Sequence, residues 1–90
     1  MRKPVFTGQF KRDFKKSEAR GLDIAKLEMV MGLLLADAPL PEGYQDHPLR
    51  FNWKGFRELH IEPDWLLIYK KIGEDSVQFD RTGTHSDLFG

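Results

Sequence analysis

The sequence predicts a small α+β domain in which two amino-terminal helices pack on one face of an antiparallel sheet. Three observations predict it: a short β-like stretch opens the chain, apolar residues then recur at helical spacing, and the pattern changes to β after Gly55. The order of elements is therefore strand, helix, helix and a meander of three strands. Because 90 residues leave room for one core, we expect residues 1–90 to form a single domain.

The first strand and the first helix lie at the amino terminus. Residues 4–7 are typical of a short strand, and Thr7 or Gly8 then begins a lysine-rich helix that runs to about Arg20. Phe10 and Phe14 are four residues apart, which gives this helix a narrow apolar stripe. Gly21 is expected to end it, because glycine readily adopts the left-handed conformation that closes helices.

The second helix has the strongest helical signal in the chain. Asp23 is a suitable N-cap, and Leu22 and Leu27 flank it with the spacing of a hydrophobic staple. The apolar stripe consists of Ile24, Leu27, Val30, Met31, Leu34 and Leu35. Met29 and Met31 are better explained by core packing than by a cofactor site.

A long loop and a β-meander complete the chain. The loop runs from Ala38 to about Trp53 without clear periodicity, which in so small a domain indicates a functional loop. The predicted strands are residues 56–61, 65–69 and 76–82. The middle one is nearly continuous apolar, as in a central strand covered on both faces.

Alternation in the last strand assigns its faces. Val77 and Phe79 mark the inward face, and strict alternation puts Arg81 on that same face. Its aliphatic stem would then lie on the rim of the core.

A neutral net charge hides an uneven distribution. Residues 1–26 carry eight basic and three acidic side chains, and residues 28–46 carry four acidic and no basic ones. Residues 50–71 return to a net charge of +2. The two basic segments would form a phosphate-binding surface if folding brings them together, although an ordinary solvated face explains them as well.

The composition also limits the kind of protein. Without cysteine, the chain has neither disulfides nor thiolate metal ligands, which fits a cytoplasmic protein. No apolar run approaches the roughly 20 residues that span a membrane. The basic residues Arg2 and Lys3 are not followed by an apolar signal segment, so we expect the chain to stay in the cytoplasm.

Five polar residues at loop or strand-end positions are candidates for catalysis. They are His47, His60, Asp64, Arg81 and His85. Each alone has a simple structural explanation: Asp64 as a turn residue, for instance, or His60 at a strand edge. As a set they match the needs of RNA cleavage without a metal, which requires a base, an acid and a cation at the phosphate.

Within this set, some roles stay open. Asp64 would either fix a histidine tautomer or act as a base itself. Trp65 and Phe89 are candidates for stacking on an unpaired base, although core burial explains Trp65 equally well.

The spacing of the histidines argues against a metal site. They are 13 and 25 residues apart, and no pair lies one helical turn apart. Two histidines and a carboxylate would still suffice as ligands for zinc or iron. We expect neither a metal nor another cofactor.

Four blocks of the sequence resemble the YafQ branch of the RelE superfamily of toxins. They are Asp46–Leu49, Trp53–Gly55, His60–Tyr69 and Arg81–Gly90. The likeness also covers the start of the first helix at Gly8-Gln9-Phe10 and the second helix, so it spans nearly the whole chain. Four blocks in order are a specific match, whereas one alone would be only suggestive.

The resemblance implies a fold and an activity. The fold is a small curved antiparallel sheet with helices packed on it. The activity is ribosome-dependent cleavage of translated messenger RNA, held inactive by a cognate antitoxin. The implied partners are that antitoxin, the messenger RNA and the ribosomal A site with its 16S RNA, with operator DNA bound only through the antitoxin complex.

The resemblance also implies residue roles. The catalytic residues would be His47, His60, Asp64, Arg81 and His85, and the substrate-binding ones Trp65, Phe89 and Lys54. The first helix matches less closely: its Lys11, Arg12, Lys15 and Lys16 suit contacts with ribosomal RNA, but only as a general basic pattern. We expect His85 as the general acid, His60 or Asp64 as the base and Arg81 at the phosphorane. His47 would orient a group or share a proton.

The main alternative is a non-enzymatic toxin of the same fold that binds a protein such as gyrase, as the related ParE toxins do. Those toxins lack this set of histidines, aspartate and arginine. Cut messages in expressing cells would favour the nuclease, and damaged DNA with intact RNA would favour the gyrase poison.

Overall fold

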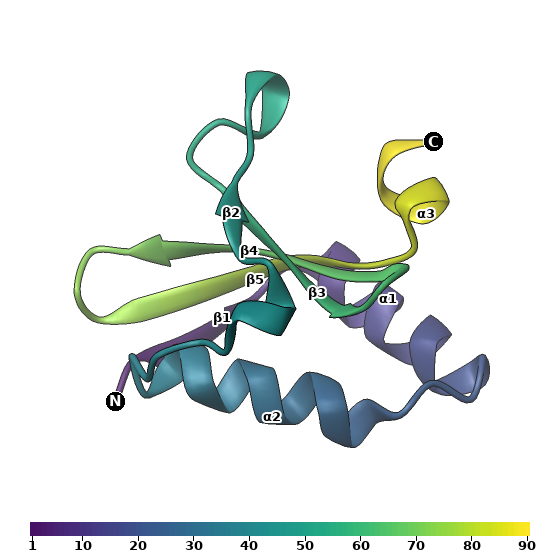
Figure 1. Cartoon of the computed structure of the whole chain (residues 1–90), viewed down its shortest axis with the longest axis horizontal. Helices are drawn as coiled ribbons and strands as arrows, with labels where there is room; N and C mark the ends of the chain where they lie inside the picture. Colours follow the sequence, from purple (N-terminus) through teal and green to yellow (C-terminus); the bar gives the residue numbers. More distant parts are fainter.

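The computed structural model describes all 90 residues and follows the predicted order, with additions in the loop and the tail (Figure 1). Its elements are β1 (Lys3–Phe6), α1 (Gly8–Ala19), α2 (Ile24–Leu35), the 3₁₀ turn η1 (Glu42–Tyr44), β2 (His47–Pro48), the 3₁₀ turn η2 (Phe51–Trp53), β3 (Arg57–Glu62), β4 (Trp65–Ile72), β5 (Ser76–Gly83) and α3 (His85–Phe89). The α+β class is confirmed.

Both long helices begin at the predicted kind of residue. The Thr7 side chain caps α1 by accepting a hydrogen bond from the Phe10 backbone N–H at 2.9 Å. The Asp23 carboxylate caps α2 through the Ala25 N–H at 3.2 Å. Between the two helices, Gly21 has a φ of +78°, the left-handed conformation expected at the end of α1.

The sheet has five strands in the order β1-β5-β4-β3-β2. Strands β3, β4 and β5 form the predicted antiparallel meander. The prediction of a purely antiparallel sheet is wrong at one edge, because β1 pairs in parallel with β5. The two helices return the chain so that the first strand lies beside the last one, where Phe6 stacks on Phe10 and Phe79 with ring centroids 5.7 and 5.8 Å apart.

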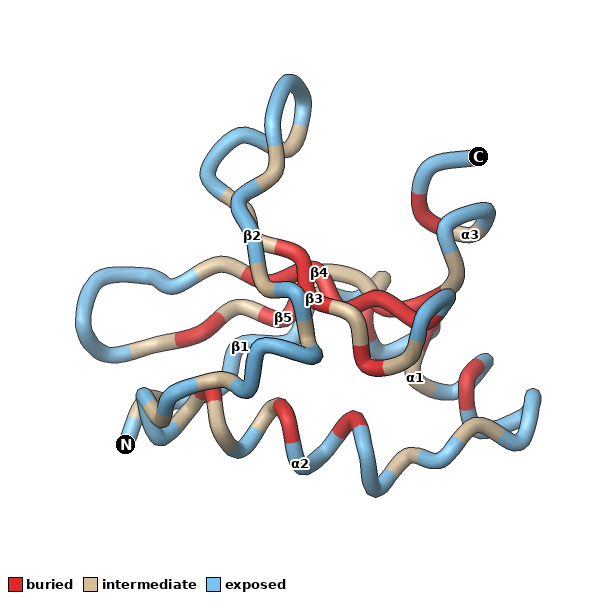
Figure 2. The backbone as a smooth tube through the Cα atoms, viewed as in Figure 1, coloured by how far each residue is buried: buried red, intermediate tan, exposed pale blue.

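The main core lies between the sheet and α1 and α2, and Figure 2 shows the buried segments concentrated in the central strands. It contains Phe10, Leu27, Val30, Leu34, Leu59, Ile61, Trp65, Leu67, Tyr69, Val77 and Phe79. A smaller cluster of Leu66, Ile68 and Leu88 lies on the other face of β4, under Leu49, Trp53 and Phe56. This confirms that β4 is covered on both faces.

An irregularity in β5 changes which side chains share a face. In the register with β4, Arg81 pairs with Ile68 while Phe79 pairs with Tyr69, so Asp80 is an extra residue in β5. Such a bulge reverses the alternation beyond it. The prediction that Arg81 shares the face of Val77 and Phe79 is therefore wrong: Arg81 lies on the opposite face.

The loop and the tail hold structure that the sequence did not predict. The loop contains η1, β2 and η2, and the tail forms α3 with a capping box between Thr84 and Asp87. Leu88 of α3 is buried on the sheet. The longest helices have 12 residues, and none is long and apolar enough to cross a bilayer.

Candidate active site

The predicted catalytic residues converge on the face of the sheet opposite α1 and α2, which we call the open face. The register pairs Arg81 with Ile68, and Ile68 with Glu58. Glu58 in turn pairs with His47 on β2. Paired residues of antiparallel strands project to the same face, and so does His60, two residues after Glu58. Three strands therefore bring residues from distant parts of the sequence into one surface.

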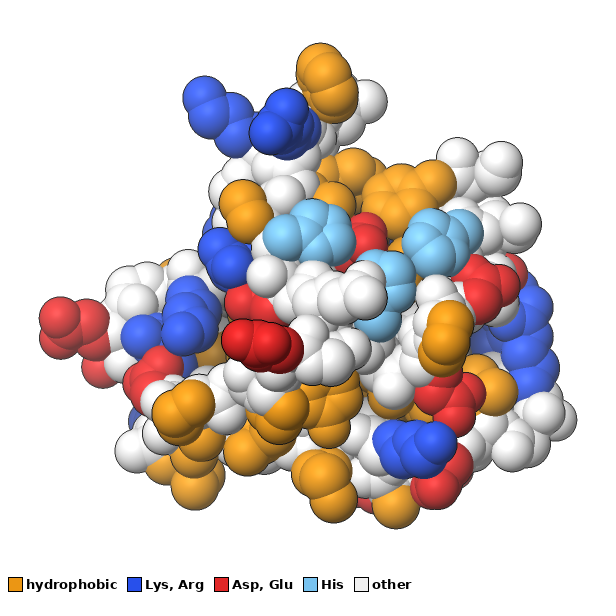
Figure 3. Space-filling model, in the orientation of Figure 1, with side chains coloured by type: hydrophobic (Ala, Val, Ile, Leu, Met, Phe, Trp, Pro, Cys, Tyr) orange, Lys and Arg blue, Asp and Glu red, His pale blue; other side chains and the backbone are white.

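The three histidines form one cluster on the open face, visible as adjacent pale-blue side chains in Figure 3. The ring centroids of His47 and His60 are 6.3 Å apart, and those of His60 and His85 are 5.7 Å apart. His85 comes from α3 rather than from a strand. The fold thus assembles the histidines that the sequence separates.

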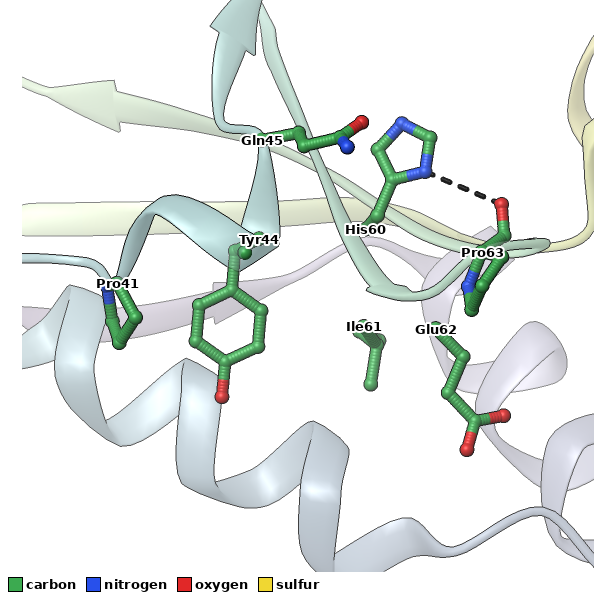
Figure 4. A pocket seen from close by; sticks show the side chains of 8 residues that line it. Pro41, Tyr44, Gln45, His60, Ile61, Glu62 and Pro63 are labelled. Carbon is green, nitrogen blue, oxygen red and sulfur yellow. Dashed lines mark hydrogen bonds between the residues drawn. The ribbon is translucent and has the colours of Figure 1, made fainter.

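Backbone oxygens hold two of the histidine rings. Nδ1 of His47 lies 2.7 Å from the carbonyl oxygen of Gln45, and Nδ1 of His60 lies 3.3 Å from that of Pro63 (Figure 4). Because a carbonyl only accepts, Nδ1 carries the proton in each ring. The other nitrogen, Nε2, is therefore the atom available to a substrate.

The third ring, that of His85, is held by Asp64. Oδ1 of Asp64 accepts a hydrogen bond from the His85 backbone N–H at 2.9 Å and one from its Nδ1 at 2.6 Å. These two bonds hold the pKa of Asp64 below its ordinary value, and the bond from the His85 backbone N–H has the larger effect. An ionised Asp64 engaged in this way has the geometry of a group that fixes a histidine tautomer.

The short helix α3 is anchored independently of His85. Asp87 accepts hydrogen bonds from Arg20 at 2.6 and 3.2 Å and from the Thr84 backbone N–H at 3.0 Å. The bond from Arg20 is the main reason that the pKa of Asp87 lies well below its ordinary value. Lys16 adds a longer contact to Asp87 at 3.4 Å. Part of the basic face of α1 therefore holds the tail in place.

Glu58 is the site residue that sequence reasoning missed. Its side chain is only 7% exposed, and its Oε1 lies 3.6 Å from Nε2 of His47 and 3.5 Å from Nε2 of His60. A carboxylate in this position can pair with either imidazole when that ring takes up a proton. The alternation of β3, which puts Glu58 on the face of His60, was the signal that would have found it.

Arg81 is tied to a buried carboxylate on α1. Its Nε and one terminal nitrogen donate to Asp13 at 2.7 and 3.2 Å, and the backbone N–H of Thr82 donates to the same carboxylate at 3.2 Å. The bond to Asp13 raises the pKa of Arg81, so the guanidinium stays charged. Its remaining N–H donors are left for a phosphate.

Trp65 does not lie on the open face. It is 2% exposed within the main core, and its indole N–H donates to the Thr82 hydroxyl at 3.0 Å. The prediction that Trp65 stacks on a substrate base is therefore wrong, and the competing explanation of core burial holds. Indole is suited to this position because its one polar group finds a partner.

The other predicted binding residues are spread over the surface. Phe89 is 46% exposed and meets Trp53 edge to face at a centroid distance of 6.3 Å. Lys54 lies at the end of η2, in the projecting loop. The four cations of α1 have different surroundings. Lys16 contacts the tail, and Arg12 bonds to Gln9. Lys11 and Lys15 line a groove together with Phe6, Phe10, Phe14 and Met31.

A hollow of about 400 Å³ opens beside His60. Tyr44, Gln45 and the turn at Pro63 contribute to its walls, and in Figure 4 the amide of Gln45 points toward the His60 ring. It lies between η1 and the β3–β4 turn. A substrate group can therefore approach His60 from this side.

Three side chains are placed to bind a metal. Single ligand atoms of Glu58, His60 and His85 all lie within 4.8 Å of one another. Histidines that ligate metals usually donate their other ring N–H to an oxygen, as these two do. Folding thus brings together ligands that are far apart in the sequence, and these three residues fit a divalent ion.

Comparison with known proteins gives a consistent family. A sequence profile described as the bacterial toxin of type II toxin–antitoxin systems, YafQ, matches residues 2–90. The chain is 49% identical over 86 residues to the mRNA interferase toxin YafQ of Escherichia coli BL21-DE3, covering 94% of this chain and 92% of that protein. It is also similar to the crystal structure of that toxin, with 46% identity, full coverage of both chains and a TM-score of 0.93.

Two further structures bear on partners and metals. The crystal structure of the E. coli DinJ–YafQ complex contains a chain 47% identical to this one, with full coverage of both and a TM-score of 0.91. A metal-bound toxin from Helicobacter pylori is 39% identical, with a TM-score of 0.91 over 99% of this chain and all of that one.

Proposed function

The chain belongs to the YafQ family of bacterial type II toxins, and we propose that it cleaves translated messenger RNA on the ribosome without a metal. As a member of this family it is an endoribonuclease toxin with a cognate antitoxin. The observation that carries the proposed mechanism is the histidine cluster, with Arg81 on the same face. The alternative of a gyrase-binding toxin has no support among these relatives, since the E. coli YafQ toxin is an mRNA interferase.

The proposed reaction is an attack by the ribose 2′-oxygen on the adjacent phosphorus. The new bond joins the 2′-oxygen to phosphorus, and the bond from phosphorus to the 5′-oxygen breaks. His60 accepts the proton of the 2′-hydroxyl through Nε2, and His85 donates a proton to the departing 5′-oxygen. Asp64 holds His85 for this step rather than acting as the base, because its Oδ1 is already bonded to His85 twice.

The proposed mechanism also assigns roles to the charged side chains near the reacting phosphate. Arg81 stabilises the phosphorane, and Asp13 fixes the direction of its guanidinium. Glu58 lies beside the Nε2 atoms of His47 and His60, where it balances the positive charge that a transferred proton creates. His47 orients the substrate or shares that proton.

We propose the ribosomal A site and its 16S RNA as the setting of the reaction. Phosphate contacts would come from exposed cations, with Lys11, Arg12, Lys15 and Lys54 as the candidates. Operator DNA would be bound only by the complex with the antitoxin. The direct test maps cuts on a message translated by purified ribosomes and on the same RNA free in solution. If the translated message is not cut, or if the free RNA is cut equally well, ribosome dependence is rejected.

Chelation should leave the cleavage rate unchanged. The proposed acid, base and cation are all protein side chains, so EDTA has nothing to remove. The measurement is single-turnover cleavage on programmed ribosomes, with the magnesium that ribosomes need restored before the assay. Loss of activity that zinc or copper restores would reject the metal-free mechanism.

Added copper or zinc should instead inhibit. An ion held by Glu58, His60 and His85 would occupy the nitrogens that the reaction uses. The control is Glu58→Gln, which removes the anionic ligand and should weaken inhibition by the ion. Equal inhibition of both proteins would place the inhibitory ion elsewhere.

The fragments should end in a 2′,3′-cyclic phosphate, or in the 3′-phosphate formed by its hydrolysis. The partner fragment should begin with a 5′-hydroxyl, since the 2′-oxygen displaces the 5′-oxygen. Mass spectrometry of the cut message reads both ends. Finding 3′-hydroxyl and 5′-phosphate ends would mean attack by an activated water and a different use of the histidines.

A further inference from the structure

The tip of the projecting loop carries an aromatic ring that the fold itself does not use. The loop between β2 and β3 extends away from the body of the molecule (Figure 1), and Phe51 lies on it with 92% of its surface exposed. Burial is the usual role of phenylalanine. The position of Phe51 is therefore not explained by packing.

The backbone at this position makes the choice of residue more unusual. Phe51 has a φ of +57°, in the left-handed region that favours glycine. A bulky side chain is disfavoured there, and this one gains no burial in return. Residues held in strained backbone conformations are concentrated at ligand-binding positions.

Backbone hydrogen bonds and aromatic packing hold the tip of the loop in place. The Leu49 N–H donates to the Phe56 carbonyl at 2.9 Å, which closes the base of the loop. The Lys54 N–H donates to the Phe51 carbonyl at 3.0 Å. Trp53 packs edge to face against Phe56 at a centroid distance of 5.4 Å, and both lie over the small cluster on β4.

A hollow of about 500 Å³ lies between the tip and the tail of the chain. Phe51 and Trp53 line it from the loop, and Phe89 lines it from α3. Phe89 is four residues after His85 on the same short helix, so α3 contributes both to this hollow and to the histidine cluster. One strand of RNA lying along α3 would meet both.

The charges of the loop indicate what that occupant is. Residues 49–56 contain two cations, Arg50 and Lys54, and no acidic residue. Aromatic rings beside cations are the pattern that binds single-stranded nucleic acid, where bases stack and phosphates pair. An acidic protein segment would match the cations but would not need an exposed ring on a strained backbone.

We propose that this hollow binds one unpaired base of the messenger RNA, stacked on Phe51, next to the scissile phosphate. Arg50 and Lys54 contact the phosphates that flank this base. The site rests on the proposed function, since it supposes a message lying across the histidines. It adds a binding residue, Phe51, that lies outside the reacting groups.

The first test is Phe51→Gly, which removes the ring and suits the local backbone. It should melt at or above the parent, because glycine accepts the positive φ. The concentration of programmed ribosomes that half-saturates cleavage should rise on the order of 10-fold, as for one lost base stack, while the saturating single-turnover rate stays within about twofold. Phe51→Trp should retain parental binding, and Phe51→Leu should behave like glycine. An unchanged half-saturation in Phe51→Gly would overturn the proposal.

A second test identifies the partner. Equilibrium binding is measured with a message that lacks the 2′-hydroxyl at the scissile ribose, so it reports the stack whether or not cleavage occurs. A set of messages is used, each lacking one base near the cut. One of these abasic messages should bind the parent protein as weakly as the intact message binds Phe51→Gly, and its loss of the base should not weaken binding to Phe51→Gly any further. If no position behaves so, the ring contacts ribosomal RNA or protein and the proposal is wrong. Loss of antitoxin affinity alone in Phe51→Gly would equally overturn it.

Discussion

His85→Ala should cleave its message on the order of 10²–10⁴-fold more slowly than the parent and still melt close to it. The loss in rate is that expected for removal of a general acid. The small change in stability follows from the structure, because the ring is half exposed and the backbone N–H that bonds to Asp64 remains in the variant. The position of α3 depends on Asp87 and Leu88 instead.

The measurement is single-turnover cleavage on programmed ribosomes, alongside thermal melts and antitoxin binding. Ser86→Ala is the matched control, since Ser86 is exposed in the same helical turn and carries no proposed role. Asp64→Asn tests the positioning of the ring and should lose part of the rate, with half-saturation little changed. Parental cleavage by His85→Ala, or a loss explained by unfolding, would reject the tail as a catalytic segment.

Arg81 should contribute on the order of 10²–10³-fold to the rate, the usual effect of one charge-stabilising donor. From its place near the end of the chain alone, Arg81→Ala would be expected to cost little stability. The structure changes this expectation: Asp13 is 6% exposed and would lose its counter-charge. We expect the single variant to lose about 1–3 kcal/mol of unfolding free energy, so its rate alone is ambiguous.

A pair of variants separates the two effects. Asp13→Asn removes the buried charge, retains an acceptor for the Thr82 N–H and leaves Arg81 charged. Adding Arg81→Ala to it should then lower the rate by the full factor with little further change in melting temperature. If the double variant cleaves as fast as Asp13→Asn alone, Arg81 has only a structural role.

Features that depend on neighbouring residues were predictable from the sequence. The capping residues Thr7 and Asp23 and the spacing of apolar residues in α2 define helices through contacts three or four residues apart. The meander was predictable too, because its strands are joined by short turns and lie beside one another. The list of polar candidates was equally accessible, since it needs only residue types and motif positions.

Features that depend on pairing between distant segments were decided by the tertiary structure alone. The parallel pairing of β1 with β5 joins the two ends of the chain, and no local pattern encodes it. The extra residue at Asp80 moves Arg81 to the open face, and a bulge depends on how the partner strand aligns.

The chemistry of the site depends on the same distant contacts. Asp13 becomes the partner of Arg81 across 68 positions, and Glu58 gains its place between His47 and His60 only when β2 pairs with β3. Trp65 is buried because its side chain lies in the main core, between the sheet and the two long helices. A sequence lists which side chains are present, but distances between them are set by register and burial, which exist only once the whole chain has folded.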